Sequence, residues 1–143
     1  MIMKILGIDV GVHTGLVLYN SESFKVEYNF TFKADDVLEF AEQLNPLMHK
    51  FNFDLVVTAY PTRVYSVIVS QSKKLGIVEY FASLMDKEVV YTNDSSAKKV
   101  VFGSGRMEKT KIHMNFKELG YNLDTEHEND SLMFARWYQL KTL

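Results

Sequence analysis

A short apolar segment interrupted by a carboxylate constrains the fold of this chain more than any other feature of its sequence. Residues 5–10 read Ile-Leu-Gly-Ile-Asp-Val, which is typical of a strand buried on both faces of a sheet. Asp9 stands near the end of this run, and a carboxylate beside buried apolar groups costs free energy unless something compensates its charge. Its partner is either a bound cation or, in the simpler interpretation, the backbone of the turn that Asp9 itself begins.

The residues that follow predict that the chain turns back beside this strand. Gly11 and the pair Thr14-Gly15 are typical turn residues, and the apolar stretch 15–19 comes next. We therefore expect a hairpin with Asp9 at the mouth of its turn, at an edge of the sheet that a metal ion or a phosphate could reach.

Hydrophobic periodicity along the rest of the chain predicts the fold class. Alternation of apolar and polar residues predicts a third strand at 24–32 with one face in solvent, and Pro46 is expected to kink or restart the first helix. Three strands in a meander followed by alternating helices and strands predict an α/β protein with a mixed five-stranded sheet and helices on both faces. The elements expected after the third strand are a helix from 35, a strand at 53–59, a helix at 65–85, a strand at 88–91, a short helix at 95–101, a flexible loop at 102–106, and helices at 108–119 and 126–140.

Composition limits the classes of protein to which the chain can belong. Its 143 residues suit one domain, 1–143, and an apolar content of 47% is too high for a disordered chain. The absence of cysteine excludes disulfides and thiolate zinc sites and fits a reducing cytoplasm. The sequence has no apolar run of membrane-spanning length, and the residues before the first strand are too few for a signal peptide, so we expect a cytoplasmic protein.

Positive charge is concentrated in one part of a chain whose formal net charge is −2. Between positions 98 and 117 six cations accompany a single acid, Glu108, which leaves a local excess of five positive charges. Such a patch can follow the phosphates of a nucleic acid, although a solvated helix face produces the same pattern. The six cations are Lys98, Lys99, Arg106, Lys109, Lys111 and Lys117.

The start of the last predicted helix carries a second possible set of ligands. His127 and Asp130 are three residues apart, so on a helix they share one face and could bind one cation or one metal-bound water. Met133 and Trp137 follow Asp130 at helical spacing and indicate that this face turns inward. The alternative is an ordinary solvated first turn. Placed opposite Asp9, the pair would become the other half of a metal site.

Three blocks of the sequence, in the same order over most of the chain, resemble the RuvC Holliday-junction resolvases. They are Ile5-Leu6-Gly7-Ile8-Asp9-Val10-Gly11 with Thr14-Gly15, then Val100-Val101-Phe102-Gly103-Ser104-Gly105-Arg106 with Glu108-Lys109 and Ile112-His113-Met114, and finally His127-Glu128-Asn129-Asp130-Ser131-Leu132. The resemblance implies a ribonuclease H-like fold, and the short chain suggests the compact phage or poxvirus branch, which implies the cytoplasm of a host cell. The first block alone is less specific, because actin-like kinases and YqgF-type nucleases begin similarly.

The resemblance also implies an activity, that of a Mg²⁺-dependent endodeoxyribonuclease that resolves four-way DNA junctions with two metal ions per site, Mn²⁺ being a possible substitute. Asp9 and Asp130 correspond to metal ligands in the family pattern, and His127 corresponds to a ligand or to a residue that orients water. Lys109 falls where the family has a lysine near the scissile phosphate. Carboxylates suit such a site because Mg²⁺ is a hard cation that prefers oxygen ligands.

One position departs from the family pattern in a way that bears directly on catalysis. The family has a further acid at the end of the fourth strand, and Ala59 stands at that expected Glu position. Because a methyl group cannot coordinate Mg²⁺, the chain is an engineered inactive variant, a natural junction-binding protein that has lost cleavage, or an enzyme in which another acid, such as Glu79 or Glu128, substitutes. We favour the engineered variant, because the other site positions and the basic loop remain intact.

The same resemblance implies contacts with DNA and a partner subunit. Paired cuts in a symmetric junction require two active sites, so we expect a homodimer, with the helix at 65–85 as its interface because its apolar residues exceed the needs of one face. Tyr65, together with Tyr60 and Phe102, is expected to stack on unpaired bases unless these rings pack in the core. The residues expected to hold the DNA backbone without reading its sequence are Lys98, Lys99, Arg106, Lys109 and Lys111.

Two further classes of function stay open at this stage. Ala59 permits a non-catalytic module that binds branched DNA without cutting it. Residues 9–15 also resemble the first phosphate loop of actin-like and kinase-type proteins, so a nucleotide-binding fragment is another interpretation, although a chain of this length lacks the second lobe of those proteins.

Overall fold

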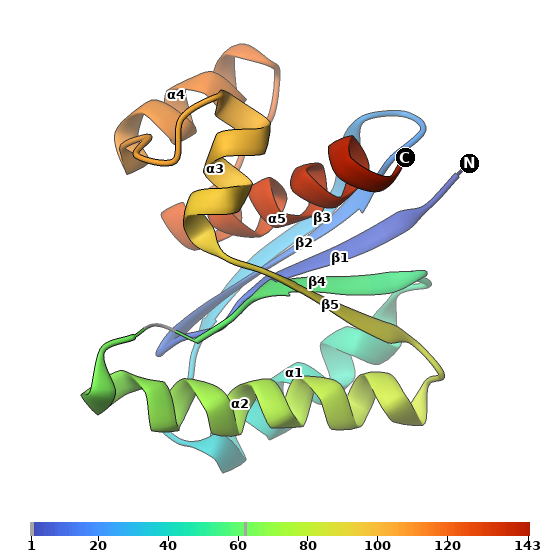
Figure 1. Cartoon of the computed structure of the whole chain (residues 1–143). Coiled ribbons are helices and arrows are strands. Elements are labelled where there is room, and N and C mark those ends of the chain that lie inside the picture. The colour runs from blue at the N-terminus through green and yellow to red at the C-terminus, as the bar shows by residue number, and fades with distance from the viewer. Residues whose placement is uncertain (1, 62) are drawn as a thin grey trace.

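The computed structural model describes residues 2–61 and 63–143, and within them one five-stranded sheet carries helices on both faces (Figure 1). The order of the strands is β3-β2-β1-β4-β5. The strands are β1 (Lys4–Asp9), β2 (His13–Asn20), β3 (Lys25–Lys33), β4 (Leu55–Ala59) and β5 (Glu88–Thr92), and the helices are α1 (Val37–Lys50), α2 (Tyr65–Leu84), α3 (Asp94–Phe102), α4 (Lys109–Glu118) and α5 (Glu126–Thr142).

Strand pairing confirms the predicted mixed sheet. β1 and β2 form an antiparallel hairpin in which Asp9 is opposite Gly15, and β3 pairs antiparallel with β2. β4 runs parallel to β1, and β5 runs parallel to β4, with Ala59 opposite Thr92. Because the carboxyl ends of parallel neighbours meet at one edge of a sheet, Asp9, Ala59 and Thr92 end their strands on the same side of the molecule.

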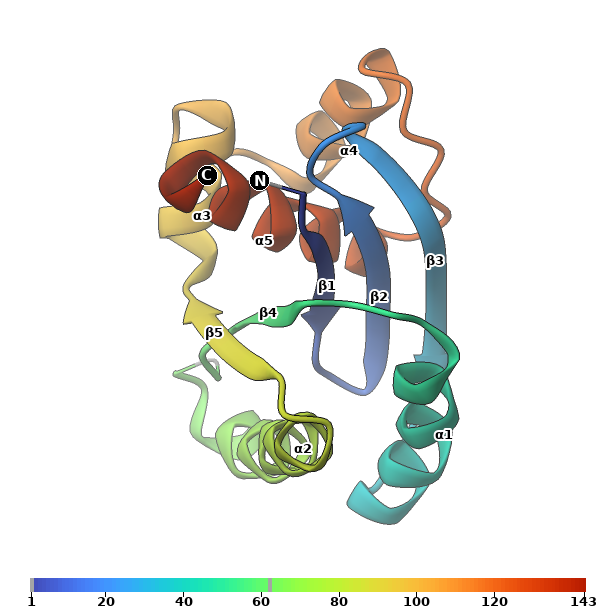
Figure 2. The ribbon, with the colours of Figure 1, turned by 90° about the vertical axis from the view of Figure 1, so that its right-hand side faces the viewer.

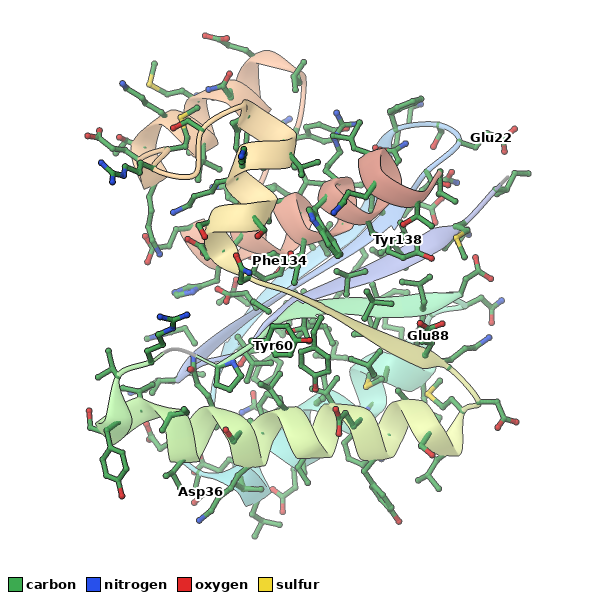
Figure 3. The ribbon with its side chains drawn as sticks, in the orientation of Figure 1. Glu22, Asp36, Tyr60, Glu88, Phe134 and Tyr138 are labelled. Atoms are coloured by element: carbon green, nitrogen blue, oxygen red, sulfur yellow. The ribbon has the colours of Figure 1, made fainter. Side chains whose placement is uncertain are left out.

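Each face of the sheet has its own apolar core. α1 and α2 cover one face and α3, α4 and α5 the other, which Figure 2 shows with the sheet between the two layers. Alternation along β1 divides its side chains between the layers, since Leu6 packs with the α1–α2 core and Ile5 with the opposite one. Phe134 of α5 lies on the second side, above the strands in Figure 3.

α5 lies unusually close to the first hairpin, and two glycines allow it. A Cβ atom on Gly7 would overlap the backbone carbonyl of Ser131, and one on Gly15 would lie 2.5 Å from the backbone of His127. Ser131 fastens the contact, because its hydroxyl donates a hydrogen bond of 2.8 Å to the carbonyl oxygen of Gly15. The first turn of α5 is therefore held directly over the end of β1, where Asp9 lies.

Three local expectations were wrong. Pro46 does not restart α1, which is continuous because buried Leu44 and Met48 anchor the helix on both sides of the proline. α3 begins at Asp94, one residue before the expected start at 95, and its N-cap is Asn93, whose side chain accepts a hydrogen bond of 2.8 Å from the backbone N–H of Ser96. Phe102 ends α3 and does not belong to the loop that follows.

No helix among the described residues combines the length and the apolar character needed to cross a membrane.

Candidate functional site

The structure places Asp9 in contact with the start of α5. The Nδ1 atom of His127 lies 3.1 Å from Oδ2 of Asp9, a distance at which the ring N–H donates a hydrogen bond to the carboxylate. Burial raises the pKa of Asp9, and the hydrogen bond and charge of His127 offset only part of that rise. The same hydrogen bond raises the pKa of His127 against the opposing effect of its burial. The two groups therefore stabilise each other's charged form at the end of β1.

Asp130 lies one turn further along α5 and is held differently. Its side chain is buried, with the whole residue only 7% exposed, and it accepts no hydrogen bond from the residues that the structure describes. Burial and, to a lesser extent, the charge of Asp9 raise the pKa of Asp130 to about 7. A nine-tenths buried carboxylate without a hydrogen-bond donor is a costly arrangement that a cation relieves.

Lys109, the first residue of α4, supplies positive charge at this point. Its Nζ atom lies 3.7 Å from Oδ2 of Asp130 and 3.7 Å from Oε1 of Glu126. Burial lowers the pKa of Lys109, but the charges of Asp130, Glu126 and Asp9 outweigh burial and raise it. The lysine therefore stays protonated and neutralises the acids around it.

His13 is a neighbour that the sequence did not reveal. Its ring stacks on that of His127, with centroids 5.6 Å apart and planes 12° from parallel. The available signal was its place in the hairpin turn, four residues after Asp9 and therefore near the same sheet edge. The ring of His13 therefore lies against one face of the imidazole whose Nδ1 edge contacts Asp9.

A pocket of about 380 Å³ opens beside these residues. It lies at the carboxyl ends of β1 and β4, where ligands bind in sheets of this type. It includes the methyl group of Ala59 and the carboxylate of Asp94, an acid that sequence reasoning passed over. The lining residues are Asp9, Val10, Ala59, Tyr60, Pro61, Gln71, Leu75, Asp94, Lys109 and Phe134.

Glu79 and Glu128, the two acids named from the sequence as possible substitutes for an acid at position 59, do not line this pocket. Oε1 of Glu79 accepts a hydrogen bond of 2.7 Å from the hydroxyl of Tyr91 on the α2 side of the sheet. Glu128 points toward β3, where it accepts hydrogen bonds from Asn29 and Thr31, at 2.6 Å and 2.5 Å. It is the third residue of α5, and its carboxylate accepts a hydrogen bond of 3.2 Å from the backbone N–H of Asp124, next to the N-cap Thr125, so it stabilises the start of the helix.

The expected DNA-binding residues fall into two groups. Lys99, Arg106 and Lys111 are exposed, whereas the side chain of Lys98 is only 13% exposed and pairs with Asp94. Among the aromatic residues, Tyr65 is 85% exposed at the start of α2.

Tyr60 and Phe102 have opposite surroundings. Tyr60 is exposed and stacks on Tyr91, with centroids 4.9 Å apart. Phe102 packs against Phe116, with centroids 5.2 Å apart, so the core-packing interpretation applies to it.

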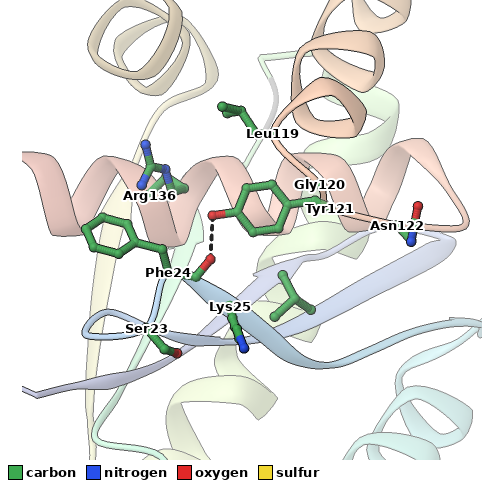
Figure 4. Close-up of a pocket in the computed structure, with 9 residues that line it drawn as sticks. Ser23, Phe24, Lys25, Leu119, Gly120, Tyr121, Asn122 and Arg136 are labelled. Atoms are coloured by element: carbon green, nitrogen blue, oxygen red, sulfur yellow. Dashed lines mark hydrogen bonds between the residues drawn. The ribbon is translucent and has the colours of Figure 1, made fainter.

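A larger pocket, about 720 Å³ in volume, lies away from these residues (Figure 4). It forms between the β2–β3 turn and the loop after α4, where the hydroxyl of Tyr121 donates a hydrogen bond of 2.8 Å to the carbonyl oxygen of Phe24. Burial raises the pKa of Tyr121 to about 12. Arg136 borders this pocket but donates its Nη1 hydrogen bonds to Tyr19 and Gln139. None of the residues predicted for catalysis lines it.

The residues that the resemblance implies as metal ligands are present, but their side chains do not surround one common position. Among residues 2–61 and 63–143 no three His, Asp or Glu side chains stand close enough together to hold a metal ion. Asp9 and Asp130 offer the oxygen donors that a hard cation requires, and the buried carboxylate of Asp130 fits a positively charged partner. In the arrangement described, His127 and Lys109 hold these two acids instead.

Comparison with known proteins shows the fold. Neither a family model nor a curated protein sequence matches the chain. Solved structures do: RuvC of Thermus thermophilus is 18% identical over 96% of this chain and 94% of that one, with a TM-score of 0.79. The same protein in complex with a Holliday-junction substrate gives 18% identity over 96% and 93%, and a TM-score of 0.81.

A viral protein gives the same result. The Fowlpox virus resolvase, in complex with substrate Holliday-junction DNA, is 16% identical over 94% of this chain and 97% of that chain, with a TM-score of 0.65. The fold is ribonuclease H-like. This confirms the fold predicted from the sequence, and the structural similarity to RuvC and to the viral resolvase agrees with the resemblance found there.

Proposed function

We propose that this protein binds four-way DNA junctions and is a divalent-metal-dependent endonuclease whose cleavage is impaired because Ala59 stands at an expected Glu position. The observation that carries the proposal is the meeting of Asp9, His127 and Asp130 with Lys109 at the end of β1. The structures of two proteins of this fold were solved in complex with a Holliday-junction substrate, which supports the same class of substrate here.

The chain's own residues have distinct parts in the proposed chemistry. Mg²⁺ or Mn²⁺, two ions per site, would supply charge stabilisation at the attacked phosphate and lower the pKa of the attacking water. Asp9 and Asp130 would hold these ions, and His127 keeps Asp9 oriented through its Nδ1 hydrogen bond. Lys109 places a positive charge beside the acids, where it would stabilise negative charge developing on the phosphate.

The exposed basic residues of α3, α4 and the loop between them would follow the DNA backbone. Lys99, Arg106 and Lys111 lie free of the ion pair that occupies Lys98. Contacts of this type give affinity that falls with salt concentration and carries no sequence preference.

Paired cuts need two sites, and α2 offers a surface for a second copy of the chain. Apolar side chains remain exposed along its length, which a monomer in water gains nothing by keeping. The largest of them at or next to α2 are Val64, Tyr65, Val67, Val69, Tyr80 and Leu84. We expect a homodimer by light scattering, and Val67→Asp should shift it to a monomer, whereas Glu42→Gln on exposed α1 surface should leave it dimeric.

A second candidate is the non-catalytic junction-binding module. Ala59 favours it, as does the absence of a three-donor cluster among the described residues. The nucleotide-binding fragment has less support, because residues 13–15 of the resembling segment lie inside β2 and leave only residues 10–12 as a loop.

Binding and cleavage of a synthetic four-way junction test the proposal. In EDTA at matched salt, a gel shift should show at least about tenfold tighter binding to the junction than to linear duplex of equal length, since the backbone term alone cannot discriminate them. With Mg²⁺ or Mn²⁺ added, cuts should be slow or undetectable. Equal affinity for junction and duplex would overturn the proposal, and binding without cleavage in either cation even after Ala59→Glu would favour the module.

A further inference from the structure

The larger pocket, between the β2–β3 turn and the loop after α4, lies apart from the candidate site. Asp9 is opposite Gly15 at one end of the first hairpin, whereas Asn20 is opposite Lys4 at the other end. The pocket borders the chain just beyond this second end, at residues 23–26. Its volume of about 720 Å³ lies in the range of pockets that hold small organic ligands. A ligand there would therefore leave the candidate site unoccupied.

The charged side chains around this pocket have one sign. Arg136 and Lys25 line it and no Asp or Glu of the described residues does, although the chain as a whole has a formal net charge of −2. Neither cation forms an ion pair within that part of the chain. Two positive charges at one cavity repel each other, and an anion bound near both relieves that repulsion. The pocket therefore favours a negatively charged ligand.

Arg136 is held in place and still has a donor to offer. Its Nη1 atom donates hydrogen bonds to the hydroxyl oxygen of Tyr19, at 3.1 Å, and to Oε1 of Gln139, at 3.0 Å. Its Nη2 atom makes no hydrogen bond to the described residues and, unlike Nε, is not fully buried. A guanidinium fixed in this way suits a phosphate, because its planar donors match the oxygens of that group.

An aromatic ring stands beside this guanidinium without being buried. Phe24 is 55% exposed, and Cζ of Arg136 lies 5.8 Å from the centroid of its ring. The φ of Phe24 is 58°, a conformation that costs a bulky residue free energy, and the Tyr121 hydroxyl holds its carbonyl oxygen (Figure 4). Asn122, also on the pocket wall, carries an exposed amide that can both donate to and accept from the edge of a base.

We propose that this pocket binds a nucleotide, with the phosphate at Arg136 and Lys25 and the base against Phe24. A phosphate alone would satisfy the two cations but would leave most of the cavity and the exposed ring without a partner. The nucleotide is either free or part of a DNA strand, since both sources place a phosphate next to a base. The inference goes beyond the proposed function, because it needs neither a metal ion nor any residue of the candidate site.

Binding of deoxyadenosine monophosphate to the whole protein in EDTA tests this, by isothermal titration calorimetry and by heteronuclear NMR spectra. The backbone amides that shift should include those of Lys25, Gly120 and Asn122. Inorganic phosphate and deoxyadenosine should each bind at least about tenfold more weakly, because each makes only part of the contacts. Arg136→Met should weaken nucleotide binding by about tenfold or more, as the loss of a charge-assisted hydrogen bond does. Lys73→Gln, at an exposed position of α2, is the matched control and should not change affinity.

Two further variants keep the test decisive if Arg136→Met unfolds, since Arg136 also bonds Tyr19 and Gln139. Lys25→Glu, at an exposed position, reverses one charge of the pocket and should weaken binding by about tenfold. Phe24→Asn removes the ring with a residue that tolerates positive φ, and should weaken binding by about threefold or more. Thermal melts identify any variant that has lost its fold.

A single-stranded oligodeoxyadenylate without a terminal phosphate distinguishes the two sources. Binding of this strand that Lys25→Glu weakens would assign the pocket to DNA, and binding of the monophosphate alone would assign it to a free nucleotide. Inorganic phosphate binding as tightly as the nucleotide, affinity unchanged in Lys25→Glu, or no binding of either nucleotide probe would overturn the inference. Asp9→Asn should leave nucleotide binding unchanged. A protein that binds the nucleotide but neither binds nor cuts junctions would therefore contradict the proposed function and not this inference.

Discussion

Two regions that meet at the candidate site are held together by different kinds of interaction. The first, here called the β1–α5 seam, is fixed by backbone contact and buried polar groups, and consists of Gly7, Asp9, Gly15, His127 and Asp130. The second, the β4–α3 edge, is more exposed and is held by a few side-chain contacts, and consists of Ala59, Tyr60, Asn93 and Asp94. The acids of the seam are held by the close contact between α5 and the first hairpin and by His127 and Lys109. Substitutions at the more exposed edge should therefore change stability less than substitutions in the seam do.

The largest effect is expected where the seam is tightest. Gly7→Ala forces a methyl group into the backbone of α5 at Ser131 and should lower the free energy of unfolding by about 3 kcal/mol or more. Gly76→Ala in α2 meets no atom within 4 Å and should raise it by about 0.5–1 kcal/mol. Urea denaturation of both variants measures the difference. Similar, small changes in the two would show that the seam is less rigid than its contacts indicate.

The next effect concerns position 59, on the β4–α3 edge. Ala59→Glu introduces a carboxylate into the pocket and should raise the rate of paired nicking of a four-way junction by about 100-fold, because the site gains a ligand for the catalytic cation. Asp9→Asn in this background should abolish the cuts. Denaturing gels with each strand labelled in turn report both. A variant that binds junctions but leaves them uncut would mean that Ala59 does not occupy the glutamate position.

The contrast also explains what the sequence could foretell of the fold. Strands with alternating or continuous apolar runs and helices with clear periodicity were all expected, because burial on the sheet dictates their patterns. The predicted helix boundaries were wrong where one polar side chain decides where the helix begins, as Asn93 does for α3. Pro46 was misjudged because buried contacts at Leu44 and Met48 outweigh one lost backbone hydrogen bond, and no local pattern shows that balance.

The residues of the candidate site also differ in whether the sequence could predict them. Asp9, His127, Asp130 and Lys109 were named from sequence, and the structure brings them together; their roles stay predictions. Asp94 could not be singled out, because the pairing of β4 with β5 decides which acid lies near Ala59.

The stability of the metal-free protein in EDTA, measured as a function of pH, tests how the charged groups of the seam affect folding. The pKa of Asp130 rises from 3.8 to about 7 on folding through burial, so the stability that its protonated form retains is lost as the pH rises across that interval. The raised pKa of His127 acts in the same direction, because its stabilising charge is lost as the pH rises through the folded-state value. The protein should therefore be less stable at pH 8.5 than at pH 5.5.

Asp130→Asn should remove much of this dependence and raise the free energy of unfolding at pH 8.5 by about 1–2 kcal/mol. Asp86→Asn, at an exposed position, should leave the pH profile as it is. Chemical denaturation at the two pH values gives the comparison. An unchanged profile in Asp130→Asn would mean that Lys109 already compensates the buried carboxylate fully.

The smallest expected effect tests whether the edge retains a contact with DNA although it lacks its acid. Tyr60 is exposed beside the pocket and its ring stacks on Tyr91, so its free face is available to an unpaired base at a junction crossover. Tyr60→Ala should weaken junction binding by about three- to tenfold, near the lower end of base–aromatic stacking, whereas Tyr60→Phe keeps the ring and should bind normally.

Fluorescence of a 2-aminopurine placed at the crossover should fall on binding only when the ring is present. Equal loss in both variants would assign the contact to the hydroxyl, and no loss in either would leave the basic residues of α3 and α4 as the sole DNA contacts on this side. Because the ring lies outside both apolar cores, neither variant should change the free energy of unfolding by more than about 0.5 kcal/mol, which separates a DNA contact from a structural role.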